Sequence, residues 1–158
     1  MMSESDERRQ QIKFKAVAAL AAKERSRLGL FKKLSEQFEE PGDAELINSV
    51  LDELEKRKYL SDERFAKSQV MIKNSRFGDQ KLRWELRRQG VSSELADEAI
   101  RENEVSELDR ARVLWERRFG EPPQDPKERA RQVRFLAYRG FSFRTIEKVL
   151  RCRLDEEE

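Results

Sequence analysis

The sequence predicts an all-α fold, an elongated array of three tandem three-helix repeats with nine helices. Composition is the first reason: of 158 residues, 42% are charged and 37% hydrophobic, with only 6 Gly and 4 Pro, which is typical of helical proteins. Internal repetition is the second, because the order of residues in Asp79–Arg101 returns in Asp125–Arg151. We therefore expect one repeat in each of residues 1–60, 61–104 and 105–154, and an acidic tail at residues 155–158.

Each copy of the repeated segment reads as a helix, a tight turn and a second helix. In the copy that begins at Asp79, this residue is the expected N-cap, and Gly90 should supply the left-handed residue that ends the first helix. Ser92 should cap the second helix. The expected inner side of the first helix consists of Leu82, Leu86 and Gln89. The matching residues elsewhere are Leu34 and Leu136 for Leu86, Gly140 for Gly90, Phe141 for Val91, Ser142 for Ser92 and Leu150 for Ile100.

The N-terminal helices follow from caps, breakers and apolar spacing. We expect a long first helix over Asp6–Arg25, with Phe14, Val17, Ala18 and Ala21 on one face. Ser26 should cap the second helix, Pro41-Gly42 should end it, and Asp43 should cap the third.

Two further helices should precede the second and third copies of the repeat, over Asp62–Ser75 and over Ser106–Phe119. Asp125-Pro126 should open the next helix, with proline at its first position. Because each set of three helices is too small to bury its own apolar faces, we expect neighbouring sets to stack on one another.

The chain lacks the residues that most catalytic and metal sites need. It contains no His and 1 Cys, which excludes His-dependent triads and most metal centres. It has no phosphate-binding loop and no dinucleotide fingerprint. The acidic pair Asp62 and Glu63 is explained by a helix start, where the dipole favours negative charge. We therefore expect no enzyme activity, cofactor, metal or small-molecule substrate.

The sequence predicts a cytoplasmic monomer. No apolar run is long enough to cross a bilayer, and Met1–Arg9 lacks the apolar core of a signal peptide. The net charge is only +2, but the charges are unevenly spread. Leu34–Glu63 is acidic, whereas Lys73–Arg88 and Lys127–Arg153 are basic. This asymmetry indicates a partner that carries both signs, or one face that meets nucleic acid; a solvated helical surface is the alternative explanation.

Residues that point away from the expected core define a candidate binding surface. Trp84 lies nearly opposite Leu82 and Leu86 on its helix, so we expect it to be exposed. Trp115 shares an apolar stripe with its neighbours, so we expect it to be buried. The residues expected to face inward in the later copy are Ala130, Val133, Leu136 and Ala137. The candidate partner-binding residues, basic or aromatic at equivalent outward positions, are Lys81, Trp84, Arg88, Lys127, Arg131, Arg134 and Tyr138. The alternative is that these long side chains only cover helix junctions.

A DNA-reading helix–turn–helix is a further interpretation of the two basic turns, RRQGVSS and YRGFSFR. That motif usually needs a small residue four positions before the turn glycine, where its helices cross. Leu86 and Leu136 occupy those positions here. The pattern therefore favours three-helix packing units over a groove-reading helix pair.

Three motifs, in order and at this spacing, resemble the RecX family of bacterial regulators of the RecA recombinase. Tyr59–Ala66 (YLSDERFA) is similar to the family's GYLDDxRFA, although Lys58 stands in place of the usual Gly and Ser61 in place of Asp or Asn. Phe77–Val91 (FGDQKLRWELRRQGV) resembles GxxRIxxELxxKGI, and Phe135–Ser142 (FLAYRGFS) resembles FLxRRGF. The likeness covers nearly the whole chain except its first dozen residues and the acidic tail.

The resemblance implies an all-α protein of three tandem three-helix repeats that binds along the groove of the RecA filament on single-stranded DNA. It further implies that the protein depresses strand exchange, ATP hydrolysis and coprotease activity toward LexA-type repressors, and that it could touch the single-stranded DNA within the filament. An alternative function of a different class is a non-specific nucleic-acid-binding helical module that acts on DNA directly.

Overall fold

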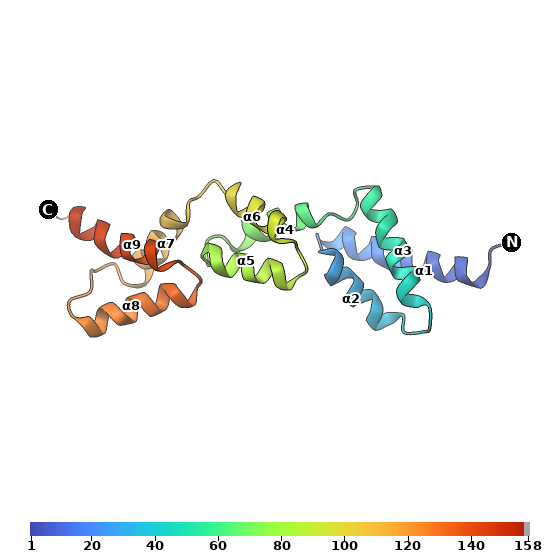
Figure 1. Ribbon diagram of the computed structural model, residues 1–158, viewed down its shortest axis with the longest axis horizontal. Coiled ribbons are helices and arrows are strands. Elements are labelled where there is room, and N and C mark those ends of the chain that lie inside the picture. Colours follow the sequence, from blue (N-terminus) through green and yellow to red (C-terminus); the bar gives the residue numbers. More distant parts are fainter. Residues whose placement is uncertain (157–158) are drawn as a thin grey trace.

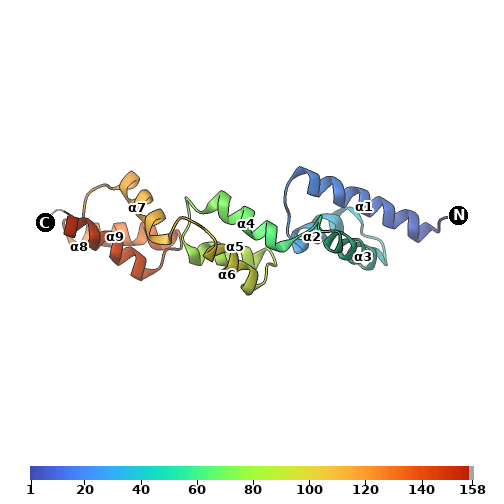
Figure 2. The ribbon, with the colours of Figure 1, turned by 90° about the horizontal axis from the view of Figure 1, so that it is seen from above.

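The computed structural model describes residues 1–156, with side chains as far as Arg151, and contains nine α-helices and no strand over these residues. The helices follow one another along an elongated molecule whose termini lie at opposite ends (Figures 1 and 2). Their bounds are α1 Glu4–Ala22, α2 Arg27–Gln37, α3 Asp43–Lys56, α4 Asp62–Lys73, α5 Asp79–Arg88, α6 Ser93–Arg101, α7 Glu107–Arg118, α8 Pro126–Tyr138 and α9 Phe143–Glu156. The predicted all-α fold is confirmed.

The helices form three consecutive units, which we call unit 1 (α1–α3), unit 2 (α4–α6) and unit 3 (α7–α9). Each unit has its own hydrophobic cluster, centred on Leu34 in unit 1, Leu86 in unit 2 and Leu136 in unit 3. No described cluster contains residues of two units. The expectation that the units bury their apolar faces against one another is therefore wrong, because each unit closes a core of its own.

The predicted helix–turn–helix pattern is present in units 2 and 3. Gly90 and Gly140 adopt left-handed backbone conformations, with φ of 86° and 87°. Such a conformation commonly ends a helix and is most favourable for glycine, which has no β-carbon. Val91 and Phe141, directly after these glycines, are buried in the core of their unit. Ser92 caps α6 as predicted, because its hydroxyl accepts a hydrogen bond from the Leu95 N–H.

Two of the predicted caps are wrong. Gly42 and Gly78 occupy the N-cap positions of α3 and α5, whereas Asp43 and Asp79 are the first residues of these helices. Both carboxylates form ion pairs with arginines of other helices instead, at 2.8 Å in each case. Side chains distant in the sequence therefore determine the role of both aspartates.

Three predicted helix faces also differ from the structure. The face of α1 that carries Phe14 and Val17 is exposed, and its buried residues are Ile12, Ala16 and Ala19. In α8, Ala130 and Ala137 are exposed, and Gln132 is the buried residue beside Leu136. Gln89, expected on the inner side of α5, is exposed at its C-cap.

Polar contacts hold units 2 and 3 together. The guanidinium of Arg110 on α7, whose side chain is only 3% exposed, donates to the Asp79 carboxylate at 2.8 Å. It also donates to the carbonyl oxygens of Asn74 and Phe77, at 2.8 and 3.1 Å. The Glu107 carboxylate accepts from the N–H of Asp79 at 3.2 Å. The first turn of α7 in unit 3 thus provides hydrogen-bond partners for backbone groups at the start of α5 and in the segment just before it.

Backbone groups join the same two units directly. The Gly78 N–H donates to the Arg139 carbonyl at 2.8 Å, and the Gln80 N–H donates to the Gly140 carbonyl at 3.2 Å. These two backbone segments lie so close together that a β-carbon on Gly78 would be 2.5 Å from the Gly140 oxygen. Units 2 and 3 therefore share a junction in which their backbones are closely packed.

The junction between units 1 and 2 is held mainly by side chains. The Arg27 N–H donates to the Asp62 carboxylate at 2.8 Å, and Arg64 pairs with Glu24 at 3.1 Å on the surface. Burial raises the pKa of the Asp62 carboxyl. Among the described residues, no backbone–backbone hydrogen bond joins α1–α3 to α4–α6. This junction is consequently less constrained than the one between units 2 and 3.

Candidate functional site

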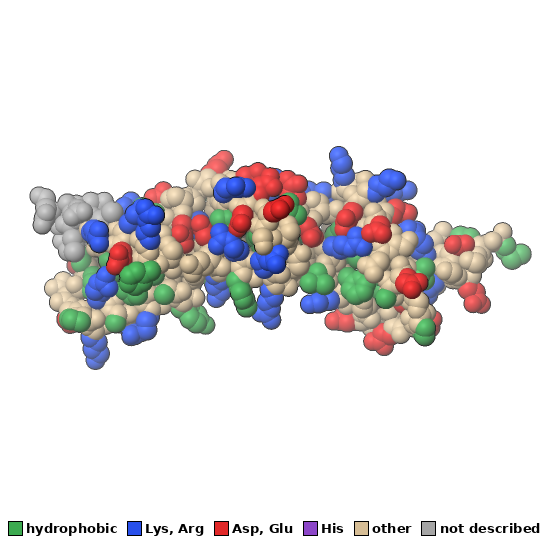
Figure 3. All heavy atoms as spheres, viewed as in Figure 1, with side chains coloured by type: hydrophobic (Ala, Val, Ile, Leu, Met, Phe, Trp, Pro, Cys, Tyr) green, Lys and Arg blue, Asp and Glu red, His purple; other side chains and the backbone are tan. Residues whose placement is uncertain are grey.

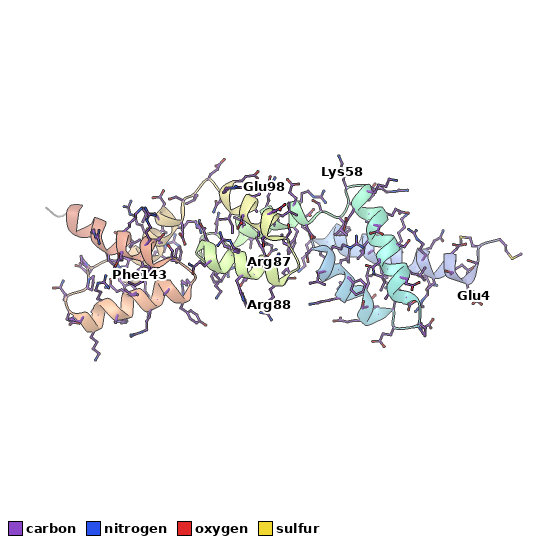
Figure 4. All side chains as sticks on the ribbon, viewed as in Figure 1. Glu4, Lys58, Arg87, Arg88, Glu98 and Phe143 are labelled. Atoms are coloured by element: carbon purple, nitrogen blue, oxygen red, sulfur yellow. The ribbon has the colours of Figure 1, made fainter. Side chains whose placement is uncertain are left out.

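The helix α5 presents an aromatic and basic pair to solvent. Leu82 and Leu86 anchor one side of α5 in the core of unit 2, each only 2% exposed. Trp84 lies on the opposite side and is 57% exposed, whereas Trp115 is 1% exposed, as predicted for both. The Arg88 guanidinium lies 5.2 Å from the centre of the Trp84 ring, a cation–π arrangement. Arg88 points away from the body of the molecule (Figure 4).

The helix α8 carries the second group of candidates. Lys127, Arg131, Arg134 and Tyr138 are all exposed along its outer side, and Tyr138 is 79% exposed. Arg131 pairs with Glu128 at 3.5 Å, and its guanidinium also lies 5.7 Å from the Phe119 ring. The cations of α8 are therefore displayed to solvent by a helix that is fixed through Gln132 and Leu136.

Lys81 connects the two helices. Its side chain is half-buried, and its ammonium lies 4.7 Å from the Phe77 ring and 5.2 Å from the Tyr138 ring. Lys81 and Tyr138 thus meet where unit 2 joins unit 3. At this position the structure agrees with the alternative interpretation, a long side chain that covers a junction.

Together these residues form one candidate surface, the α5–α8 edge, which consists of Lys81, Trp84, Arg88, Lys127, Arg131, Arg134 and Tyr138. The helices α5 and α8 lie along the same long edge of the molecule (Figure 1). Along this lower edge, Lys and Arg side chains alternate with hydrophobic ones (Figure 3). Exposed Arg and aromatic side chains are enriched at protein interfaces, so the edge is suited to binding a macromolecule.

A groove beside Trp84 extends this surface towards unit 1. It has a volume of about 390 Å³ and is lined by Lys32, Gln69, Val70, Lys73, Leu82, Trp84, Glu85, Leu86, Arg88 and Gln89. Sequence reasoning missed Lys32, which lies on α2. The repeat could have identified it. Lys32 lies two positions before Leu34, and Trp84 and Arg134 lie two positions before the matching residues Leu86 and Leu136.

The described part of the chain offers no arrangement for metal chemistry and no membrane-spanning helix. Over these residues, no group of His, Cys, Asp or Glu side chains could hold a metal ion. None of the described helices is both long and apolar enough to cross a bilayer. The exposed cations and aromatic rings of the α5–α8 edge can bind a partner through charge, aromatic contact and hydrogen bonds.

Comparison with known protein families supports this picture. Family models of the second and third three-helix domains of RecX match residues 61–100 and 105–150. A protein named Regulatory protein RecX from Leptothrix cholodnii is 42% identical over 140 residues, which cover 89% of this chain and 87% of that protein. The protein of the same name from Pseudomonas putida is 39% identical over 137 residues, covering 85% of this chain and 86% of that protein.

Solved structures show the same fold. The crystal structure of RecX from Lactobacillus salivarius superposes with a TM-score of 0.76 at 18% identity, covering 94% of this chain and 97% of that one. A second crystal structure, of a regulatory protein RecX, gives a TM-score of 0.75 at 18% identity and covers 94% and 79%. The relatives are named regulatory proteins rather than enzymes. On its sequence and its fold, this chain belongs to the RecX family.

Proposed function

We propose that this chain binds the RecA filament on single-stranded DNA as a monomer and inhibits its recombinase, ATPase and coprotease activities. Membership of the RecX family supports a regulatory role rather than a catalytic one. A regulator of this kind acts by binding one state of its partner more tightly than another. An elongated surface with repeated contacts suits a filament, whose binding sites also repeat.

The observation that carries the proposal is the α5–α8 edge. It displays Trp84 and Arg88 from unit 2 and Arg131, Arg134 and Tyr138 from unit 3 on one side of the molecule. These are the residue types that contribute most to interface energies when they become buried. Two adjacent units can therefore contact two adjacent sites of a repeating partner.

The rate of DNA-dependent ATP hydrolysis by RecA tests the proposal. We expect the rate to fall as the chain is added. Inhibition well below one chain per RecA protomer would indicate capping of filament ends, and inhibition only near one per protomer would indicate occupation of the groove. An unchanged rate at every ratio would contradict the proposal.

The same preparation should be tested for binding to naked DNA at several salt concentrations. A chain that leaves RecA unaffected but binds DNA tightly, with affinity that falls steeply with salt, would be a non-specific nucleic-acid-binding module. Inhibition of RecA under conditions in which naked DNA is not bound would exclude that alternative.

A further inference from the structure

The groove beside Trp84 has walls from units 1 and 2, which are joined by fewer hydrogen bonds than units 2 and 3. Lys32 on α2 contributes the wall from unit 1, and α4 and α5 contribute the rest. Arg110 and two backbone hydrogen bonds fix unit 3 to unit 2, whereas units 1 and 2 are joined by the Arg27 N–H bond to Asp62 and by the exposed Arg64–Glu24 pair. A ligand in this groove would therefore bridge the less constrained junction of the molecule.

The cations of the groove are only partly neutralised. The Lys73 ammonium lies 2.6 Å from the Glu85 carboxylate, so this pair carries no net charge. Among the described residues, neither Lys32 nor Arg88 has a carboxylate within ion-pair distance. Lys32 of unit 1 and Arg88 of unit 2 therefore line the groove without a counter-charge. The groove is complementary to a segment with negative charge.

The base and rim of the groove favour a peptide over nucleic acid. Its base reaches the aliphatic side chains of Val70, Leu82 and Leu86. A phosphodiester backbone carries no aliphatic group to fill this base, whereas a peptide can place an apolar side chain there. A peptide with an apolar side chain between two carboxylates would pack that side chain against the aliphatic base and pair its carboxylates with Lys32 and Arg88.

We propose that this groove is the docking site for an acidic segment of the partner protein, in which an apolar side chain is flanked by carboxylates. The apolar side chain packs beside Trp84, and the carboxylates pair with Lys32 and Arg88. Docking would then hold unit 1 at one angle to units 2 and 3. This inference rests on the proposed function, because it names the chemistry by which a RecA filament would be recognised.

Charge reversal at Lys32 tests the site against a closely matched control. Lys33 is the next residue of α2, is also exposed, and does not line the groove. Lys32→Glu and Lys33→Glu change the net charge equally, so general attraction to the filament is altered equally. We expect Lys32→Glu to raise the concentration for half-inhibition of RecA about tenfold, and Lys33→Glu to change it less than about twofold. Melting curves by circular dichroism should show that both variants fold.

A photo-crosslinking residue identifies the occupant. With p-benzoylphenylalanine in place of Gln69, which lines the groove, irradiation in the presence of RecA filaments should yield a crosslink to RecA. Mass spectrometry should place it in a segment with an apolar residue between Asp or Glu. The same label in place of Ala44, an exposed residue of α3, should not reach that segment.

The outcomes separate the two proposals. Inhibition by the wild-type chain, with equal effects of the two lysine variants or a crosslink from position 69 to DNA, would overturn the groove assignment and leave the proposed function standing. No inhibition by the wild-type chain would overturn the proposed function and the groove assignment with it.

Discussion

Gln132 is buried against Trp115 of the unit 3 core, at the repeat position that Leu30 and Leu82 occupy in units 1 and 2. Its side-chain oxygen accepts a hydrogen bond from the indole N–H of Trp115 at 2.8 Å, in a fully buried contact. Its amide nitrogen donates to the Glu121 carbonyl at 3.1 Å. A buried Trp needs an acceptor for its indole N–H. Gln132 is therefore polar at a core position because it supplies this acceptor to Trp115.

Replacing Gln132 by Leu should therefore destabilise the protein despite the apolar surroundings. The indole N–H would lose its buried partner, at a cost of about 1–3 kcal/mol in the free energy of unfolding, measured in urea. The double variant Gln132→Leu/Trp115→Phe should lose less than the sum of the single changes, because it removes both polar groups. Strictly additive losses would show that the hydrogen bond contributes nothing.

A second residue-scale prediction concerns Asp43 and acid. The buried Asp43 carboxylate accepts from Arg8 at 2.8 and 3.1 Å and from the Glu40 N–H at 2.9 Å. The hydrogen bonds from Arg8 hold the pKa of this carboxyl below its ordinary value of 3.8. A carboxyl with a lower pKa in the folded state stabilises the fold above the unfolded-state pKa, and this contribution is lost as pH falls through the folded pKa.

We therefore expect Asp43→Asn to lower the free energy of unfolding at neutral pH and to flatten its decline in acid. Urea unfolding at a series of pH values measures both effects. Parallel acid curves for the variant and the parent would contradict the assignment.

At the scale of elements, local signals predicted every described helix and most turns. The caps Ser26 and Ser92, the left-handed Gly90 and the proline at the start of α8 depend on residues within one turn. The inner face of α1 could not be predicted in this way. This helix has apolar residues on two sides, so spacing alone could not show that Ile12 is buried and Phe14 is 73% exposed.

The start of α5 offers an element-scale prediction. A β-carbon on Gly78 would meet backbone atoms of unit 3 at 2.5 Å, so Gly78→Ala should force units 2 and 3 apart. Overpacking of this kind typically costs about 1–3 kcal/mol, which thermal unfolding would detect. Small-angle scattering should also show a changed molecular shape. Gln80→Ala, at an exposed position of the same helix start, should leave both measurements unchanged. An equal effect of the two substitutions would contradict the close fit of this junction.

At the scale of the whole molecule, the repeat predicted the number and order of the helices but not how the units meet. The junctions depend on Arg110, Glu107 and Asp62, whose partners lie on other helices far away in the sequence. Apolar periodicity does not report such contacts. The α5–α8 edge was predictable because outward positions follow directly from the inward ones, although its role in binding stays a prediction.

Separate cores imply that unit 3 can be removed whole. A chain of residues 1–104 keeps the complete clusters of units 1 and 2 and loses mainly the polar contacts of Arg110 and Glu107. We expect it to remain helical, monomeric and cooperative in unfolding. A chain of residues 1–125 should aggregate, because it keeps α7 but loses the helices that bury Trp115. Gel filtration and circular dichroism distinguish the two, and aggregation of the shorter chain would contradict independent cores.

The central claim is that the α5–α8 edge contacts the RecA filament, and one charge-reversal pair tests it directly. Arg134 lies on the outer stripe of α8, and Arg129 is an exposed residue on a different side of the same helix. Titrating each variant into the RecA ATPase assay gives the concentration for half-inhibition. We predict that Arg134→Glu raises this concentration about tenfold or more and that Arg129→Glu changes it less than about twofold, with melting curves unaltered. Equal inhibition by both variants and the parent chain would contradict the assignment of this edge as the binding surface.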